Sequence, residues 1–65
     1  MIEEVKKKLQ ARHAEELADA KAYDDLAKEA MEAGHHHVCG ILTDIANEEK
    51  SHAELIEHIL NYHEK

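Results

Sequence analysis

The sequence predicts an all-α protein, an antiparallel helical hairpin that dimerises into a four-helix bundle. Three features support this prediction. The 65 residues contain no proline and only two glycines. Apolar residues recur with helical spacing on both sides of Gly34. Two helices also leave much of each apolar stripe open, whereas four helices enclose a core. We therefore expect one domain over residues 1–65, with helices at about 2–33 and about 36–62.

The first helix is predicted by a segment rich in Ala, Glu, Lys and Leu that lacks glycine and proline. Glu3 and Glu4 fall in its first turn, where acidic side chains suit the positive end of the helix dipole. An inward stripe follows alternating steps of four and three residues, the spacing of a helix face that packs on other helices. Its members are Leu9, His13, Glu16, Ala20, Tyr23, Ala27 and Ala30.

The second helix is predicted to begin after Gly34, a residue that readily takes the left-handed conformation in which helices end. Gly40 lies inside this helix at a cost of about 1 kcal/mol relative to alanine, and we expect it to allow close approach of a neighbouring helix. The predicted inward stripe has the same four-and-three spacing. It comprises Val38, Leu42, Ile45, Glu49, His52, Ile56 and Ile59.

Two carboxylates and an imidazole therefore fall on the predicted inward stripes. Glu16 lies 18 residues before Gly34 and His52 lies 18 residues after it, which places both about 27 Å from the turn. An antiparallel hairpin then brings Glu16, Glu49 and His52 to one level. Because buried carboxylates are costly without compensation, we expect a metal ion there. Two-fold symmetry would gather four carboxylates, whose charge two divalent cations balance. This donor set suits Fe or Mn, with Zn also possible.

Composition excludes several other classes of function. The formal net charge of −7 argues against nucleic acid or an anionic membrane as a partner. No apolar stretch approaches the ~20 residues that span a bilayer, and the N-terminus shows no signal-peptide pattern. Cys39 is the only cysteine, so an internal disulfide is impossible. A cytoplasmic protein is expected.

The stretches Glu-Leu-Ala-Asp-Ala-Lys-Ala-Tyr at 16–23 and Ile-Ala-Asn-Glu-Glu-Lys-Ser-His-Ala at 45–53 resemble the ferritin-like superfamily. The closest likeness is to its rubrerythrin-like branch and to half-bundle members with two helices, and it covers roughly residues 10 to 60. Such proteins carry a Glu on each of two helices and Glu-x-x-His on the other two. The resemblance implies that Glu16 and His52 are terminal metal ligands, that Glu49 bridges two metals, and that Tyr23 is a catalytic residue beside the ligands.

The resemblance further implies a di-iron centre with two iron ions per homodimer or within a higher homo-oligomer. The implied activity is ferroxidase or peroxide-reducing, with O₂ or peroxide as a small oxidant. The chain departs from full rubrerythrin-like proteins in having one helix pair instead of two. It also lacks the cysteines of an iron–sulfur module, so an electron donor would have to be a separate protein.

Other interpretations of the same residues remain open. The three polar residues can form a layer that sets bundle register without metal, and the hairpin can be an interaction module or a subunit of an iron-storage assembly. His13 can be an extra ligand or a partly buried histidine, Glu48 can orient His52 or face solvent, and Tyr23 can fill the core. His35, His36 and His37 point in different directions and cannot all bind one ion, so we expect surface residues or weak adventitious metal binding there. Cys39 is expected to be a buried or neutral thiol and not a nucleophile.

Overall fold

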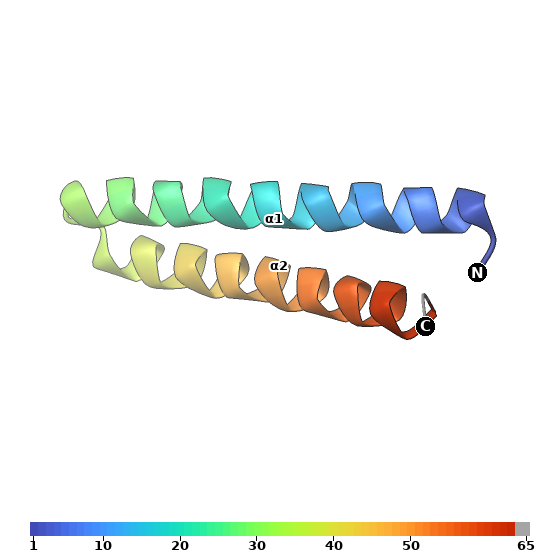
Figure 1. The fold of residues 1–65 in the computed structure, drawn as a ribbon. Coiled ribbons are helices and arrows are strands. Elements are labelled where there is room, and N and C mark those ends of the chain that lie inside the picture. The colour runs from blue at the N-terminus through green and yellow to red at the C-terminus, as the bar shows by residue number, and fades with distance from the viewer. Residues whose placement is uncertain (64–65) are drawn as a thin grey trace.

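The computed structural model describes residues 1–63, which form two helices joined by a short turn. Helix α1 spans Glu3–Glu32 and helix α2 spans His36–His63, and the two run antiparallel side by side (Figure 1). The hairpin is confirmed, with bounds within one residue of those predicted. Its radius of gyration is 14.9 Å over extents of 48 × 15 × 11 Å, whereas a compact domain of this length has about 11 Å. Neither helix is long and apolar enough to cross a membrane.

The turn follows from Gly34, whose φ is +84°. The N–H of His35 donates to the carbonyl of Ala30 (2.8 Å), and the N–H of Gly34 donates to that of Met31 (3.0 Å). These two bonds are the pattern of a Schellman cap, which needs a left-handed residue at this position. Gly40 behaves differently. A Cβ there would meet no heavy atom within 4 Å, so the close approach expected at Gly40 is not made within the hairpin.

The contact between the helices is built from alanines. Ala20 and Ala27 on α1 and Ala46 and Ala53 on α2 are all buried, with Ala46 fully so. Small side chains let the two helix backbones approach closely. The predicted stripe of α1 is confirmed in full, since each of its seven members is buried or half-buried.

The predicted stripe of α2 is partly wrong. Val38 and Ile59 are 47% and 39% exposed, and His52 is also exposed. The apolar face of α2 is wider than one partner helix can cover, and α1 covers the row next to the predicted one. This contact row comprises Cys39, Leu42, Ala46, Glu49, Ala53, Ile56 and Leu60, all buried or half-buried.

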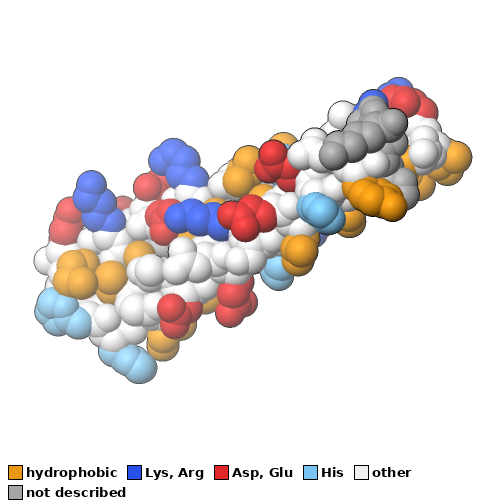
Figure 2. Space-filling view, turned by 60° about the horizontal axis from the view of Figure 1, so that its bottom comes forward, with side chains coloured by type: hydrophobic (Ala, Val, Ile, Leu, Met, Phe, Trp, Pro, Cys, Tyr) orange, Lys and Arg blue, Asp and Glu red, His pale blue; other side chains and the backbone are white. Residues whose placement is uncertain are grey.

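A second row on α2 lies beside the contact row, and all of its members except the half-buried Ile45 are exposed. We call it the outer stripe, and it comprises Val38, Ile41, Ile45, Glu48, His52, Leu55 and Ile59. Its steps alternate between three and four residues, which is the spacing of a seam that packs on another helix. Leu55 is 64% exposed. Figure 2 shows that hydrophobic side chains reach the surface along the hairpin among charged ones.

The opposite flank of the contact row is charged. Lys50 Nζ lies 3.0 Å from Asp24 Oδ2, and His13 Nε2 lies 3.8 Å from Glu57 Oε2. Both pairs join α1 to α2. Exposed pairs of this kind contribute less than about 1 kcal/mol each, but their partners come from different helices and favour one axial alignment. The hairpin therefore has a charged flank and an apolar flank.

Candidate metal centre

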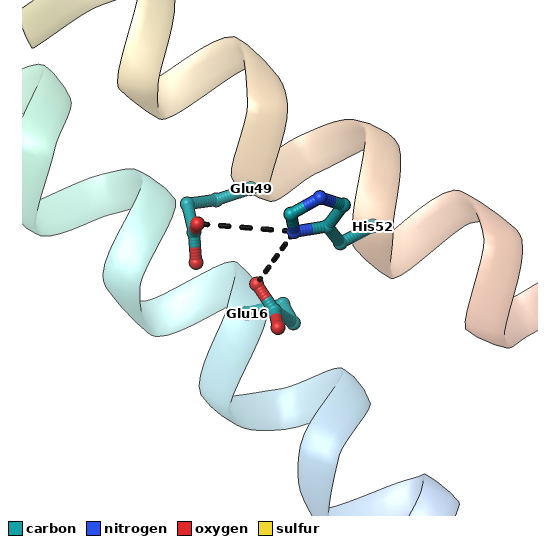
Figure 3. Close-up of side chains that lie close together, drawn as sticks. All are labelled: Glu16, Glu49 and His52. Atoms are coloured by element: carbon teal, nitrogen blue, oxygen red, sulfur yellow. Dashed lines mark ion pairs between the residues drawn. The ribbon is translucent and has the colours of Figure 1, made fainter.

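Glu16 lies near the middle of α1, and Glu49 and His52 lie near the middle of α2. Figure 3 shows that the three side chains converge between the helices. His52 Nδ1 lies 3.6 Å from Glu16 Oε2 and 3.9 Å from Glu49 Oε1. One ligand atom from each residue lies within 4.8 Å of the other two. Glu49 and His52 are three residues apart and so share a helix face, while the antiparallel turn brings Glu16 to the same level.

Burial differs across the three residues. The Glu16 residue is 8% exposed, the Glu49 side chain is 21% exposed and the His52 side chain 53%. Within residues 1–63, Oε2 of Glu16 is buried and has no hydrogen-bond partner. Buried polar atoms are nearly always satisfied, and a carboxylate oxygen left alone is especially costly. This oxygen faces the His52 ring, so a cation at the centre of the cluster would lie beside it.

The two carboxylates perturb one another. The pKa of Glu49 is raised above its ordinary value, first by a hydrogen bond with Glu16, then by burial and by repulsion from the Glu16 charge. The same hydrogen bond, helped by the His52 and Arg12 charges, lowers the pKa of Glu16 although burial opposes this. When both groups are ionised neither can donate, and Oε2 of Glu16 is then unpaired. At low pH, a single proton on Glu49 removes the repulsion between the two carboxylates.

The donor set fits a divalent transition metal. Two carboxylates and one imidazole suit Fe, Mn or Zn, whereas the cluster contains no thiolate. Ligand atoms about 2.1 Å from a common ion lie about 3.0 to 3.5 Å apart, and the separations of 3.6 and 3.9 Å are only slightly larger. They are also too long for direct hydrogen bonds. The spacing of the three ligand atoms, all within 4.8 Å of one another, is therefore close to the spacing that an ion between them would require.

The remaining predicted residues lie outside the cluster. Tyr23 is half-buried two turns of α1 beyond Glu16, and it is not among the three residues that converge. His13 is engaged by Glu57 on the charged flank. Glu48 is exposed on the outer stripe, and Cys39 is half-buried on the contact row. The three turn histidines, His35, His36 and His37, are exposed.

One residue at the site was missed by the sequence analysis. Arg12 Nη2 donates to Glu16 Oε1 over 3.5 Å, which gives that oxygen a charged partner. The sequence signal was present, because Arg12 precedes Glu16 by four residues and therefore shares its helix face.

Comparisons of the chain with protein-family models, with curated proteins and with solved structures found no match. The likeness to ferritin-like proteins therefore depends on the residue pattern alone.

The raised pKa of Glu49 predicts how the stability of the metal-free protein depends on pH. A carboxyl whose pKa is raised on folding stabilises the fold below its ordinary value of 4.5, and this contribution is lost as pH rises through the raised pKa. The lowered pKa of Glu16 changes the stability only at pH values below this ordinary value. As pH rises above about 4.5 and through the raised pKa of Glu49, the free energy of unfolding of the wild type should therefore fall relative to Glu49→Gln.

Urea unfolding followed by circular dichroism measures this difference, with chelator present throughout. A difference between the two proteins that stays constant across the pH range would contradict the proposed sharing of a proton between Glu16 and Glu49.

Proposed function

We propose that the protein binds divalent transition metal at Glu16, Glu49 and His52, and that two copies share a dinuclear centre, with iron as the metal. The observation that carries this proposal is the buried, unpaired Oε2 of Glu16, which faces two further ligand atoms. A cation there would satisfy this oxygen and balance both carboxylates. The proposal places the chain among ferritin-like proteins of the rubrerythrin-like type.

The second copy is proposed to pack on the outer stripe. His52 belongs to that stripe, and Glu49 lies on the neighbouring contact row, so a helix covering the stripe would also cover the open side of the cluster. A two-fold pairing of α2 with its copy buries the same stripe on both chains and completes a four-helix bundle. Four carboxylates and two divalent cations then cancel in charge. A higher homo-oligomer would need a further interface.

The chemistry proposed is oxidation of Fe(II) by O₂ or reduction of peroxide, with iron supplying the one-electron steps. Glu16 and Glu49 contribute oxygen ligands, and His52 contributes Nδ1, the ring nitrogen that faces them. With Glu49 of each copy bridging both metals, four protein side chains would bind each metal, and a six-coordinate iron would keep positions open to a small oxidant. Tyr23 is proposed as a catalytic residue through the family resemblance alone. Reduction of the centre would require a separate electron donor.

A non-catalytic interaction module is the second candidate function. The outer stripe favours it, because an exposed row with seam spacing fits a helix of another protein as well as a copy of this chain. The two candidates differ in what they require of the carboxylates. An interaction module has no use for metal, and its stability would not respond to added cations.

Anaerobic titration of the metal-free protein with Fe(II) tests the leading proposal. We expect saturable binding of one iron per chain, because each chain contributes one set of three ligands. Glu49→Ala should lower the affinity at least about 10-fold. Glu54→Ala removes the same charge from an exposed position of the same helix and should leave binding intact.

Oxygen or peroxide consumption by the loaded protein then tests turnover. Failure of the folded wild type to bind Fe(II) would contradict the metal-site proposal. Equal losses in Glu54→Ala and Glu49→Ala would show that overall charge, not the cluster, attracts the metal.

Substitution of Ile41 by lysine tests the proposed dimer without touching a ligand. Ile41 is 48% exposed on the outer stripe, and a lysine buried there should weaken self-association at least about 30-fold. Leu17→Lys is the matched control. Leu17 is similarly exposed but lies four residues after His13 and seven before Asp24, on the charged flank.

Sedimentation velocity over a range of concentrations measures the association of both variants. We expect a dimer for the wild type and Leu17→Lys, and a monomer for Ile41→Lys. A wild type that remains monomeric while binding its full complement of iron would contradict the shared site.

A further inference from the structure

The Arg12 guanidinium joins two consecutive carboxylates beside the cluster. Its Nη1 lies 2.7 Å from Glu15 Oε2, and its Nη2 lies 3.5 Å from Glu16 Oε1. The first pair is short and exposed, and it holds the guanidinium on the surface of α1. The second pair is longer and reaches the buried ligand. Arginine presents its donors in a fixed fork, so one side chain can engage both carboxylates.

The two oxygens of Glu16 therefore face different groups. Oε1 faces Arg12, and Oε2 faces His52 and the centre of the cluster. The guanidinium cannot lose its proton in this pH range, so Oε1 is always beside a full positive charge. The Arg12 charge also contributes to the lowered pKa of Glu16. A metal ion at the cluster would have to share this carboxylate with Arg12.

We propose that Arg12 is a built-in competitor of the metal and thereby sets the affinity of the site. This inference rests on the proposed metal-binding function. The guanidinium stabilises Glu16 when no metal is bound and repels a divalent cation when one enters. It also restricts Glu16 to ligation through Oε2, which keeps a coordination position open. Arg12 is thus a positioning and affinity-determining residue and does not itself bind the metal.

Arg12→Gln tests the competition, with Lys21→Gln as its control. Lys21 also forms an exposed pair four residues along α1, with Nζ 3.1 Å from Asp25 Oδ2, so both variants lose one positive charge and one helix-surface pair. Lys21 is more than one turn beyond Glu16, and its pair with Asp25 includes no cluster residue. Arg12→Lys restores the charge and should bind metal within about twofold of the wild type.

Anaerobic Co(II) binding, followed by ligand-field absorption and competition with a chelating dye, gives the dissociation constants. At low ionic strength, Arg12→Gln should bind Co(II) roughly three- to tenfold more tightly than the wild type, and added salt should shrink the gap. Lys21→Gln should change affinity less than about twofold. The absorption bands should shift in Arg12→Gln only, because Glu16 can then offer both oxygens.

Thermal unfolding without metal supplies the second readout. Arg12→Gln should melt below Lys21→Gln, since Glu16 loses its charged partner. If Arg12 has only a structural role, the stability and the Co(II) affinity of Arg12→Gln should fall together. Weaker or unchanged Co(II) binding by Arg12→Gln would overturn the inference about Arg12 but not the proposed metal site. No Co(II) binding by the folded wild type would instead overturn the proposed function and this inference together.

Discussion

Two carboxylates held at one level between two helices impose the constraint on which the rest of this structure depends. Glu16 and Glu49 come from opposite helices, are largely shielded from water, and repel one another when ionised. Arg12 and His52 offset part of this repulsion from the two sides. Neither supplies a hydrogen bond to Oε2 of Glu16 within the described residues. A cation at the centre of the cluster would relieve all of these conflicts at once.

The packing of the helices makes this constraint possible but leaves part of the apolar surface of α2 exposed. Alanines on both helices bring the backbones close enough for Glu16, Glu49 and His52 to meet. The same small side chains bury little apolar area, and a chain of this length has little stability in reserve. Leu42, Ile56 and Leu60 are half-buried on the contact row, but the other large aliphatic side chains of α2 lie on the outer stripe. The proposed second copy would cover this stripe and the open side of the cluster.

Much of the fold follows from the sequence because the signals are local. The absence of proline, the single stop at Gly34 and the stripe through Glu16 and Ala20 sufficed for the hairpin and its register. The inward face of α2 was harder to predict. Two apolar rows with the same spacing lie side by side on that helix, and periodicity cannot say which row the partner covers. Val38 and His52 were accordingly predicted to face inward and are exposed.

The three converging residues of the site could also be predicted from the sequence, but the role of Arg12 could not. Equal distances from the turn brought Glu16 and His52 together, since helix rise is constant. The role of Arg12 was missed because an exposed arginine before a glutamate is ordinary on any helix, and only the burial of Glu16 makes the pair significant. Tyr23 stays a prediction from family likeness, because its seven-residue spacing from Glu16 places it on the same face without bringing it into the cluster.

The most direct measurement is the thermal unfolding of Glu16→Gln/Glu49→Gln against the wild type at neutral pH, with and without Fe(II) under anaerobic conditions. If the carboxylates exist to bind metal, the metal-free variant will be at least as stable as the wild type. Fe(II) will then stabilise the wild type alone, by about 2.7 kcal/mol at one hundred times its dissociation constant. A variant less stable than the metal-free wild type, with no response of the wild type to Fe(II), would contradict the account and identify the cluster as a polar layer that sets helix register.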